Sequence, residues 1–241
     1  MLATRIVPAI SAGGSKVAVL AIRIIPTILC RGRAMVKGQR FNSWRSVGLA
    51  AQAVRVHQAR GCDELVLLDI GATPEGRGPD LDLVRELSEV CFMPLTVGGG
   101  VRSVQDVRDL LAAGADKVAL GTGAITPPGL LDKCSRTFGK QAIVACLDYD
   151  KFATVWLRGS RISTNQSPVG MANHFVREGA GEIILTSIER EGTMSGYDLD
   201  TIKAVSSAVD IPVIAHGGCG TYEHMVEAVR AGASAVEAGA M

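Results

Sequence analysis

An internal repeat is the feature of this sequence that most constrains its fold. Residues 94–123 and 212–241 align without gaps at an offset of 118 residues and share eight identical positions. Each copy opens with a proline, continues as a short apolar run and reaches consecutive glycines ahead of a helical pattern. Such periodicity is typical of folds that repeat one structural unit. The chain therefore consists of two similar halves.

Short apolar runs alternate with amphipathic stretches in both halves. Strands are expected at residues 23–29, 64–70, 94–97, 117–120, 142–147, 182–187, 212–215 and 235–238. Helices are expected at residues 47–59, 80–90, 103–113, 127–137, 168–178, 198–208 and 221–231. Strands joined by helices run parallel with right-handed crossovers, and eight of them close most simply into a (β/α)₈ TIM barrel. A doubly wound open sheet is the alternative, but the two-fold internal repeat favours the barrel.

The two ends of the chain fit this pattern less well. Residues 3–10 nearly repeat residues 21–28, and we assign the first strand to the second copy because a polar loop and a helical pattern follow it. Residues 1–20 are then an N-terminal extension of unclear structure, and residues 21–241 form the barrel. At the internal offset Met241 corresponds to a residue that precedes the fourth helix of the first half. We therefore expect a C-terminally truncated barrel that lacks its eighth helix, with the extension packed beside the eighth strand.

The composition narrows the possible functions. With 25 basic and 24 acidic side chains, the chain has no charge excess of the kind that nucleic-acid binding requires. No apolar run approaches the roughly 18 residues of a membrane span, and the first residues lack a signal-peptide layout. The four histidines show no metal-ligand spacing. We expect a cytoplasmic protein that uses neither a metal nor another cofactor and binds neither nucleic acid nor membrane.

Glycine-containing loops follow corresponding strands in each half. Backbone N–H groups of such loops approach anions closely, and the dipole of the following helix favours negative charge. We interpret them as two phosphate sites facing each other across the barrel mouth; the alternative is that the glycines only form tight turns. The candidate phosphate-binding residues are Gly99, Gly100, Gly121 and Thr122 in the first half and Gly192, Gly217, Gly218, Gly239 and Ala240 in the second. Lys37, in the loop after the first strand, is a further candidate, although a solvated lysine is equally consistent with its position.

Two aspartates end predicted strands at the active-site face of a barrel. Asp148 ends the fifth strand, where a carboxylate points into the mouth and can act as a general acid or base. Asp69 ends the second strand in the same way and is a second, weaker candidate. The alternative for such a residue is a helix cap or a loop anchor. Residues 149–166 interrupt the alternation nearby and predict a small hairpin.

Four charged residues each occupy the first position of a predicted strand. They are Arg23, Glu64, Lys117 and Glu182, in the first, second, fourth and sixth strands. In a barrel these positions surround the bottom opening, where charges usually serve stability. A neutral ring of this kind is equally consistent with a gate.

From about Ala21 onward the chain resembles the cyclase subunit of imidazole glycerol phosphate synthase, the HisF family. The resemblance rests on residues 63–70, 94–100, 115–118, 181–187 and 192–198. It implies a (β/α)₈ barrel in a heterodimer with a glutaminase (HisH-like) subunit docked at the bottom. Ammonia from that partner would pass through the barrel to a bisphosphorylated substrate at the top. The resemblance further implies that Arg23, Glu64, Lys117 and Glu182 form an ammonia gate and that Asp148 is catalytic.

One catalytic residue implied by the resemblance is missing. The family has a second aspartate at the end of the first strand, where this chain has Leu29, and a leucine cannot transfer protons. HisF-like paralogues associated with amidation of surface-polysaccharide sugars resemble this chain in having a leucine at this position. We favour that function over the cyclase step of histidine biosynthesis. A barrel that only activates a glutaminase is a third possibility, against which Asp148 and the glycine loops argue.

Overall fold

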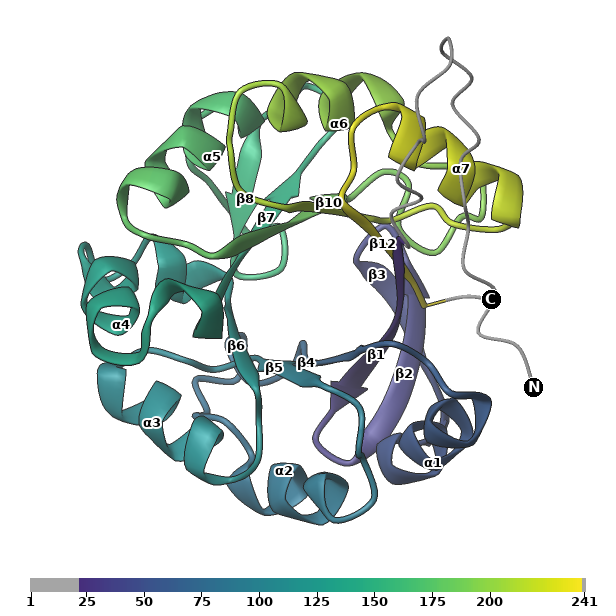
Figure 1. Ribbon diagram of the computed structural model, residues 1–241, viewed down its shortest axis with the longest axis vertical. Helices are drawn as coiled ribbons and strands as arrows, with labels where there is room; N and C mark the ends of the chain where they lie inside the picture. Colours follow the sequence, from purple (N-terminus) through teal and green to yellow (C-terminus); the bar gives the residue numbers. More distant parts are fainter. Residues whose placement is uncertain (1–21, 240–241) are drawn as a thin grey trace, which may run out of the picture.

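Eight apolar runs form the parallel strands of one closed sheet in a computed structural model that describes residues 22–239. The barrel strands are β1 (Arg23–Arg31), β4 (Leu65–Asp69), β5 (Leu95–Gly98), β6 (Lys117–Leu120), β7 (Ile143–Tyr149), β10 (Glu182–Ser187), β11 (Val213–His216) and β12 (Ala235–Ala238). Each strand pairs with the next one in this order, β10 pairs with β7, and β12 pairs with β1, so the sheet has no edge (Figure 1). The predicted TIM barrel is confirmed, and the open sheet is excluded.

Seven α-helices surround the barrel within residues 22–239 (Figure 1). They are α1 (Ala50–Arg60), α2 (Leu81–Ser88), α3 (Val104–Ala112), α4 (Leu130–Phe138), α5 (Pro168–Arg177), α6 (Leu199–Ser206) and α7 (Tyr222–Arg230). Five of them begin at side chains that accept a hydrogen bond from the backbone N–H three residues later, which satisfies an otherwise unpaired donor. One cap is Ser167, on α5. The other four form two pairs, Asp80 and Asp198 on α2 and α6, and Ser103 and Thr221 on α3 and α7. Each pair lies 118 residues apart, so the repeat includes the caps.

Two separate apolar clusters hold the barrel together. The larger one lies between the sheet and the helices. The smaller one fills the lumen and draws on alternate strand residues, because successive side chains of a strand point to opposite faces. Its buried members are Ile25, Val66, Ala119, Val144, Ile184, Ile214 and Ala235. This apolar layer separates the bottom of the barrel from its mouth.

The segment after β1 differs from the sequence-based expectation. Residues 31–40, predicted as a loop, and the start of the predicted first helix instead form a hairpin of β2 (Ala34–Gln39) and β3 (Asn42–Leu49). β2 pairs with the end of β1, which places Val36 against the core at 6% exposure. Extending the barrel sheet satisfies backbone groups that a loop would leave to solvent. Helix α1 therefore begins at Ala50 and not near residue 47.

The hairpin predicted at residues 149–166 is present. It consists of strands β8 (Val155–Leu157) and β9 (Ile162–Ser163), which follow β7. Two short 3₁₀ turns lie elsewhere, η1 (Thr122–Ala124) after β6 and η2 (Lys140–Ala142) before β7. The predictions for the N-terminal extension and for the missing eighth helix concern segments that lie outside the described residues. None of the helices of residues 22–239 is long and apolar enough to cross a membrane.

Candidate active site

The four predicted strand-start charges come together at the bottom of the barrel. The guanidinium of Arg23 lies 2.7 Å from Glu64 and 2.9 Å from Glu182, and the ammonium of Lys117 lies 2.9 Å and 3.1 Å from the same two carboxylates. Thr96 donates a further hydrogen bond to Glu64 at 3.1 Å. Burial opposes ionisation of Glu64, but the two cations outweigh it and lower the pKa of this carboxyl. The result is a closed, neutral ring across the lumen, below the apolar layer.

The first-half glycine loops line a cavity at the opposite end of the barrel. Its volume is about 300 Å³, and it lies between the carboxyl ends of the strands and the two hairpins. The predicted residues at this cavity are Asp69, Gly99, Gly100, Gly121, Thr122 and Asp148. Trp44 and Trp156, one from each hairpin, face the same space together with Arg31 and Arg158. Arg161 also lines it, so the cavity combines backbone amides, three guanidinium groups and aromatic surface.

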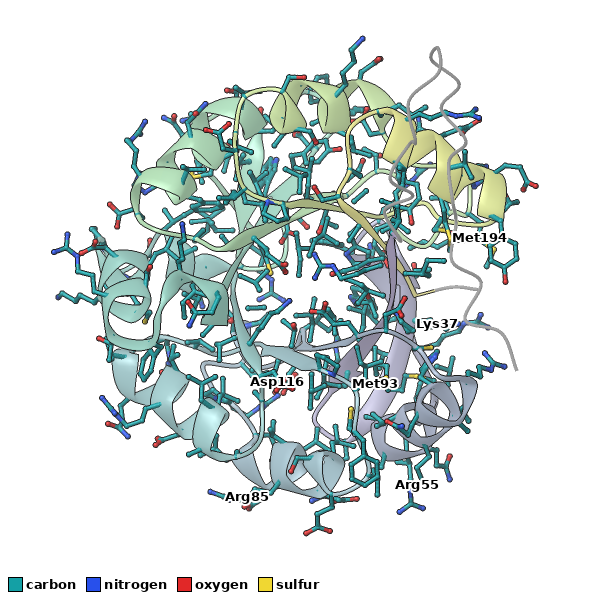
Figure 2. All side chains as sticks on the ribbon, in the orientation of Figure 1. Lys37, Arg55, Arg85, Met93, Asp116 and Met194 are labelled. Atoms are coloured by element: carbon teal, nitrogen blue, oxygen red, sulfur yellow. The ribbon has the colours of Figure 1, made fainter. Side chains whose placement is uncertain are left out.

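The second-half loops line a second cavity of about 270 Å³. The predicted residues there are Lys37, Gly192, Gly217, Gly218 and Gly239, whereas Ala240 lies outside the described residues. Lys37 lies on β2 and not in a loop as predicted, and Figure 2 shows it and Met194 on the same side of the barrel. The repeat therefore produces two neighbouring cavities rather than one, and Leu29 and His216 line both.

Corresponding glycines in the two cavities adopt conformations that other residues avoid. Gly99 has φ of 115° and Gly217 has φ of 90°. A Cβ atom at Gly99 would lie 2.3 Å from the carbonyl oxygen of Asp69, and one at Gly217 would lie 2.7 Å from that of Ser187. Glycine is required at both positions, because the loop passes against the preceding strand end. This requirement accounts for the tight packing of each loop against the strand end.

Asp148 ends β7 on the lumen side and faces the first cavity. It lies beside Thr186 of β10 in the strand register. Burial raises the pKa of Asp148 to about 7, with a smaller contribution from the charge of Glu191 and an opposing hydrogen bond from Thr186. A carboxyl group with a pKa near the working pH can both donate and accept a proton. The position and the pKa suit a general acid or base.

Asp69 occupies the corresponding strand end in the first half but is fully engaged in local contacts. One carboxylate oxygen accepts hydrogen bonds from the backbone N–H groups of Gly71 and Ala72, at 2.9 and 3.2 Å. The other oxygen lies 3.1 Å from the guanidinium of Arg77. These contacts favour the loop-anchor alternative for this residue, and its acid–base role stays a prediction.

Metal binding has no cluster of ligands to support it in the part of the chain that the structure describes. Within residues 22–239, no three His, Cys, Asp or Glu side chains come together in an arrangement that could hold a metal ion.

Comparison with known proteins identifies the family. The sequence profile of the histidine biosynthesis protein family matches residues 23–241. The chain belongs to this family. It is 47% identical over 221 residues to the imidazole glycerol phosphate synthase subunit HisF of Hyphomonas neptunium, which covers 90% of this chain and 88% of that protein. The HisF subunit of Caulobacter vibrioides is 45% identical over 221 residues (90% and 85%), and that of Endomicrobium trichonymphae is 44% identical over 226 residues (92% and 87%).

This member of the histidine biosynthesis protein family has a leucine at a central position of its site. Leu29 lies on β1 beside Leu68 of β4 in the register, and it lines both cavities. Its counterpart across the lumen is Asp148. Leu29 pairs with Leu68, Asp148 pairs with Thr186, and these two partners lie 118 residues apart. The site thus has a single carboxyl group at these two facing positions instead of a pair.

Sequence reasoning missed one buried carboxylic acid of the family member's lumen. Glu237 is 0% exposed in the middle of β12, and its Oε2 atom accepts a hydrogen bond of 2.9 Å from Thr27. The signal was present in the sequence, because an acidic residue interrupts the apolar run of the eighth strand at a lumen-facing position. His216, at the end of β11, likewise received no role from the sequence.

Proposed function

We propose that this chain is an enzyme subunit that carries out the ammonia-dependent cyclase step of imidazole glycerol phosphate synthase in histidine biosynthesis. The proposal is supported by the names of relatives that are 44–47% identical over most of the chain. Their names favour this reading over the sugar amidation that Leu29 suggested. The single observation of the structure that carries it is Asp148, with its raised pKa, at the mouth of a two-cavity site.

In this proposal the two cavities each hold one phosphate of a bisphosphorylated substrate. Glycine N–H groups provide the hydrogen bonds in both, and Lys37 adds a positive charge to the second. The substrate then spans Leu29 and His216, which line both cavities, and its middle lies near Asp148. Asp148 transfers protons during ring closure.

Ammonia is proposed to enter from a glutaminase subunit bound at the bottom of the barrel. Uncharged ammonia crosses an apolar layer at far lower cost than ammonium, because an unpaired charge is expensive to bury. The charged ring formed by Arg23, Glu64, Lys117 and Glu182 closes the lumen at the entrance. Opening it requires displacement of at least one side chain, so the ring acts as the gate in this proposal.

Steady-state turnover of the purified chain tests the proposal. With an ammonium salt and the bisphosphorylated substrate of imidazole glycerol phosphate synthase, the chain should form imidazole glycerol phosphate without its partner. Asp148→Asn should bind the substrate and fail to convert it. Absence of product with the wild-type chain, despite substrate binding at both cavities, would contradict the proposal.

Sugar amidation remains the second candidate, and Leu29 is the observation that favours it. An amidation needs ammonia but not the pair of facing carboxylates that the resemblance implies for cyclisation. Binding of a sugar nucleotide at one cavity only, measured by calorimetry, together with no imidazole product, would support it. Loss of both activities with retained stimulation of a glutaminase would instead indicate a scaffold.

A further inference from the structure

A row of polar side chains crosses the second half of the lumen just above the apolar layer. We call it the polar belt, and it consists of Asp148, Thr186, His216 and Glu237. The first three lie side by side in the strand register, on β7, β10 and β11. Glu237 lies on the next strand, β12, and faces β1. The belt therefore leads from the proposed catalytic carboxyl group to the strand that carries Leu29.

The members of the belt are within contact distance of one another. The Nδ1 atom of His216 lies 3.4 Å from the hydroxyl oxygen of Thr186 and 3.5 Å from Oε2 of Glu237. Thr27 donates a hydrogen bond to the same Oε2 atom at 2.9 Å. In the described part of the chain, Oε1 of Glu237 has no hydrogen-bond partner. A buried carboxylate with an unpartnered oxygen is costly, so this arrangement favours the protonated acid.

The pair of His216 and Glu237 can release one net proton near neutral pH. Burial raises the pKa of Glu237 to about 8, with further contributions from Glu64 and Glu182, and burial lowers the pKa of His216 to about 4. A neutral carboxylic acid thus lies beside a neutral imidazole. Such a pair can release a proton and take it back without leaving a net positive charge in the lumen.

His216 is the member of this pair that can touch a ligand. It lines both cavities, whereas Glu237 lines only the second one and is fully buried. Both contacts of the imidazole within the belt involve Nδ1. The other ring nitrogen, Nε2, is therefore the atom that remains for a bound substrate.

We propose that His216, positioned and supplied with a proton by Glu237, is the second proton-transfer residue of this site and acts where Leu29 cannot. The inference rests on the proposed cyclase function and adds a residue to it. When the substrate is protonated, Nε2 gives up its proton while Nδ1 takes the proton of Glu237, which becomes a carboxylate. When the substrate later loses a proton, the same path returns it to Glu237. Protons and charge balance, and no further reactant is needed.

Turnover of three variants tests the role. Glu237→Gln keeps the shape and an acceptor for Thr27, and His216→Gln removes the imidazole. We expect kcat to fall by about 10-fold or more in the first and about 100-fold in the second, with little change in KM, as for other acid–base groups. Ser206→Ala is the matched control, because the Ser206 hydroxyl is another buried group without a partner in the described chain but lies outside the lumen. It should retain wild-type turnover.

A rescue experiment separates proton transfer from packing. Leu29→Asp places a carboxyl group at the end of β1, and in the Glu237→Gln background it should restore turnover at least in part. A purely structural loss would not be repaired by a new carboxylate on another strand. Wild-type turnover in both the Glu237→Gln and His216→Gln variants, with Asp148→Asn inactive, would overturn the inference and leave the proposed function intact.

A titration gives a readout that needs no turnover. The ¹⁵N shifts of the His216 ring are followed from pH 5 to 9 in the Asp148→Asn background, which removes the group that titrates near 7. Other ionisable groups that face the pair are Arg23, Glu64, Cys146 and Glu182 in the lumen and Lys37, Arg45 and Glu191 at the second cavity. A proton release near pH 8 that disappears in Glu237→Gln supports the inference even if the wild-type chain forms no imidazole product. Identical titration curves with and without Glu237 would overturn it.

Discussion

The two halves of the barrel have the same framework but different lumens. Positions 118 residues apart are Leu68, Gly98 and Ala119 in the first half and Thr186, His216 and Glu237 in the second. The first set is apolar and tightly packed, since a Cβ atom at Gly98 would lie 2.9 Å from both Leu68 and Ala119. The second set forms most of the polar belt. The repeat thus preserves the strands, the helix caps and the glycine loops, while the polar belt occurs in one half only.

This difference indicates a division of labour within one site. The first-half cavity contains the aromatic and guanidinium groups, and its strand-end aspartate, Asp69, anchors a loop. The second half contributes the polar belt, including Asp148. Matched substitutions in the two halves should therefore have unequal effects.

Substitution of the two strand-end aspartates should give the largest difference in turnover and stability. Asp148→Asn is expected to lower kcat by about 10²- to 10⁴-fold, the range for general acid–base groups, without loss of stability. Asp69→Asn should instead destabilise the fold, because the loop loses the ion pair between Asp69 and Arg77, and Arg77 keeps only Glu75 as a carboxylate partner. Turnover and chemical denaturation of both variants measure the contrast. Equal loss of turnover at equal stability would contradict the division between the halves.

The pH dependence of stability provides a check on Asp148. Its pKa is about 7 in the folded state against an ordinary 3.8, so the folded protein binds a proton that the unfolded chain releases in between. Stability contributed by this group therefore falls as pH rises from 3.8 to about 7. Asp148→Asn should be more stabilising at pH 8 than at pH 4, and a constant difference would argue against the raised pKa.

Substitution of the two acidic members of the charged ring should give the next largest difference, in the free energy of unfolding. Glu64 is more deeply buried than Glu182, with side-chain exposures of 4% and 15%, and it also accepts the hydrogen bond of Thr96. Glu64→Gln should cost about 3 kcal/mol of unfolding free energy, and Glu182→Gln about 1–2 kcal/mol. Because the pKa of Glu64 is lowered from 4.5, its contribution is present above that pH and is lost as the pH falls through the folded-state value. Urea denaturation at pH 7 and pH 3 checks both statements.

The ring variants also test the proposed gate. Charge reversal at Glu64 or Lys117 should impair glutamine-dependent turnover of the complex more than turnover with added ammonium salt. Equal losses in the two assays, with the fold intact, would assign the ring to stability alone.

The paired glycines should show the smallest difference. Gly99→Ala and Gly217→Ala both force a side chain to positive φ, which costs about 1–3 kcal/mol. The clash is closer at Gly99, 2.3 Å against 2.7 Å, so that variant should be the less stable one. Each should weaken inorganic phosphate binding at its own cavity only, as measured by calorimetry. Loss of both sites from one substitution would show that the cavities do not act independently.

Much of this architecture follows from patterns that are local in the sequence. The eight strands, the seven helices and the strand-start charges were readable because apolar periodicity and the 118-residue offset specify them directly. The hairpin after β1 was not readable, because β2 pairs with the last two residues of β1, which do not pair with β12. Asp69 and Asp148 look alike in the sequence, and only the contact with Arg77, eight residues further on, separates an anchor from a candidate acid.

Glu237 shows a different limit of sequence reasoning. Its position in an apolar strand predicts burial, but its protonation and its chemical role depend on which groups face it from other strands. Those groups are Thr27 and His216, 210 residues earlier and 21 residues earlier in the chain. A carboxylic acid beside a hydroxyl donor and an imidazole can exchange a proton with them, whereas the same residue facing only apolar side chains would destabilise the fold.

The common wall of the two cavities has a consequence for how products leave. A ligand that fills both cavities gains from the high effective concentration of its second phosphate once the first is bound, commonly in the millimolar range for short linkages. Two modest anion sites thereby hold one long substrate firmly. A reaction that cuts the substrate between its phosphates abolishes this advantage at the moment of cleavage, and each fragment is then held by one cavity alone. For a reaction of this kind, the chemical step itself lowers the affinity of the site for both products.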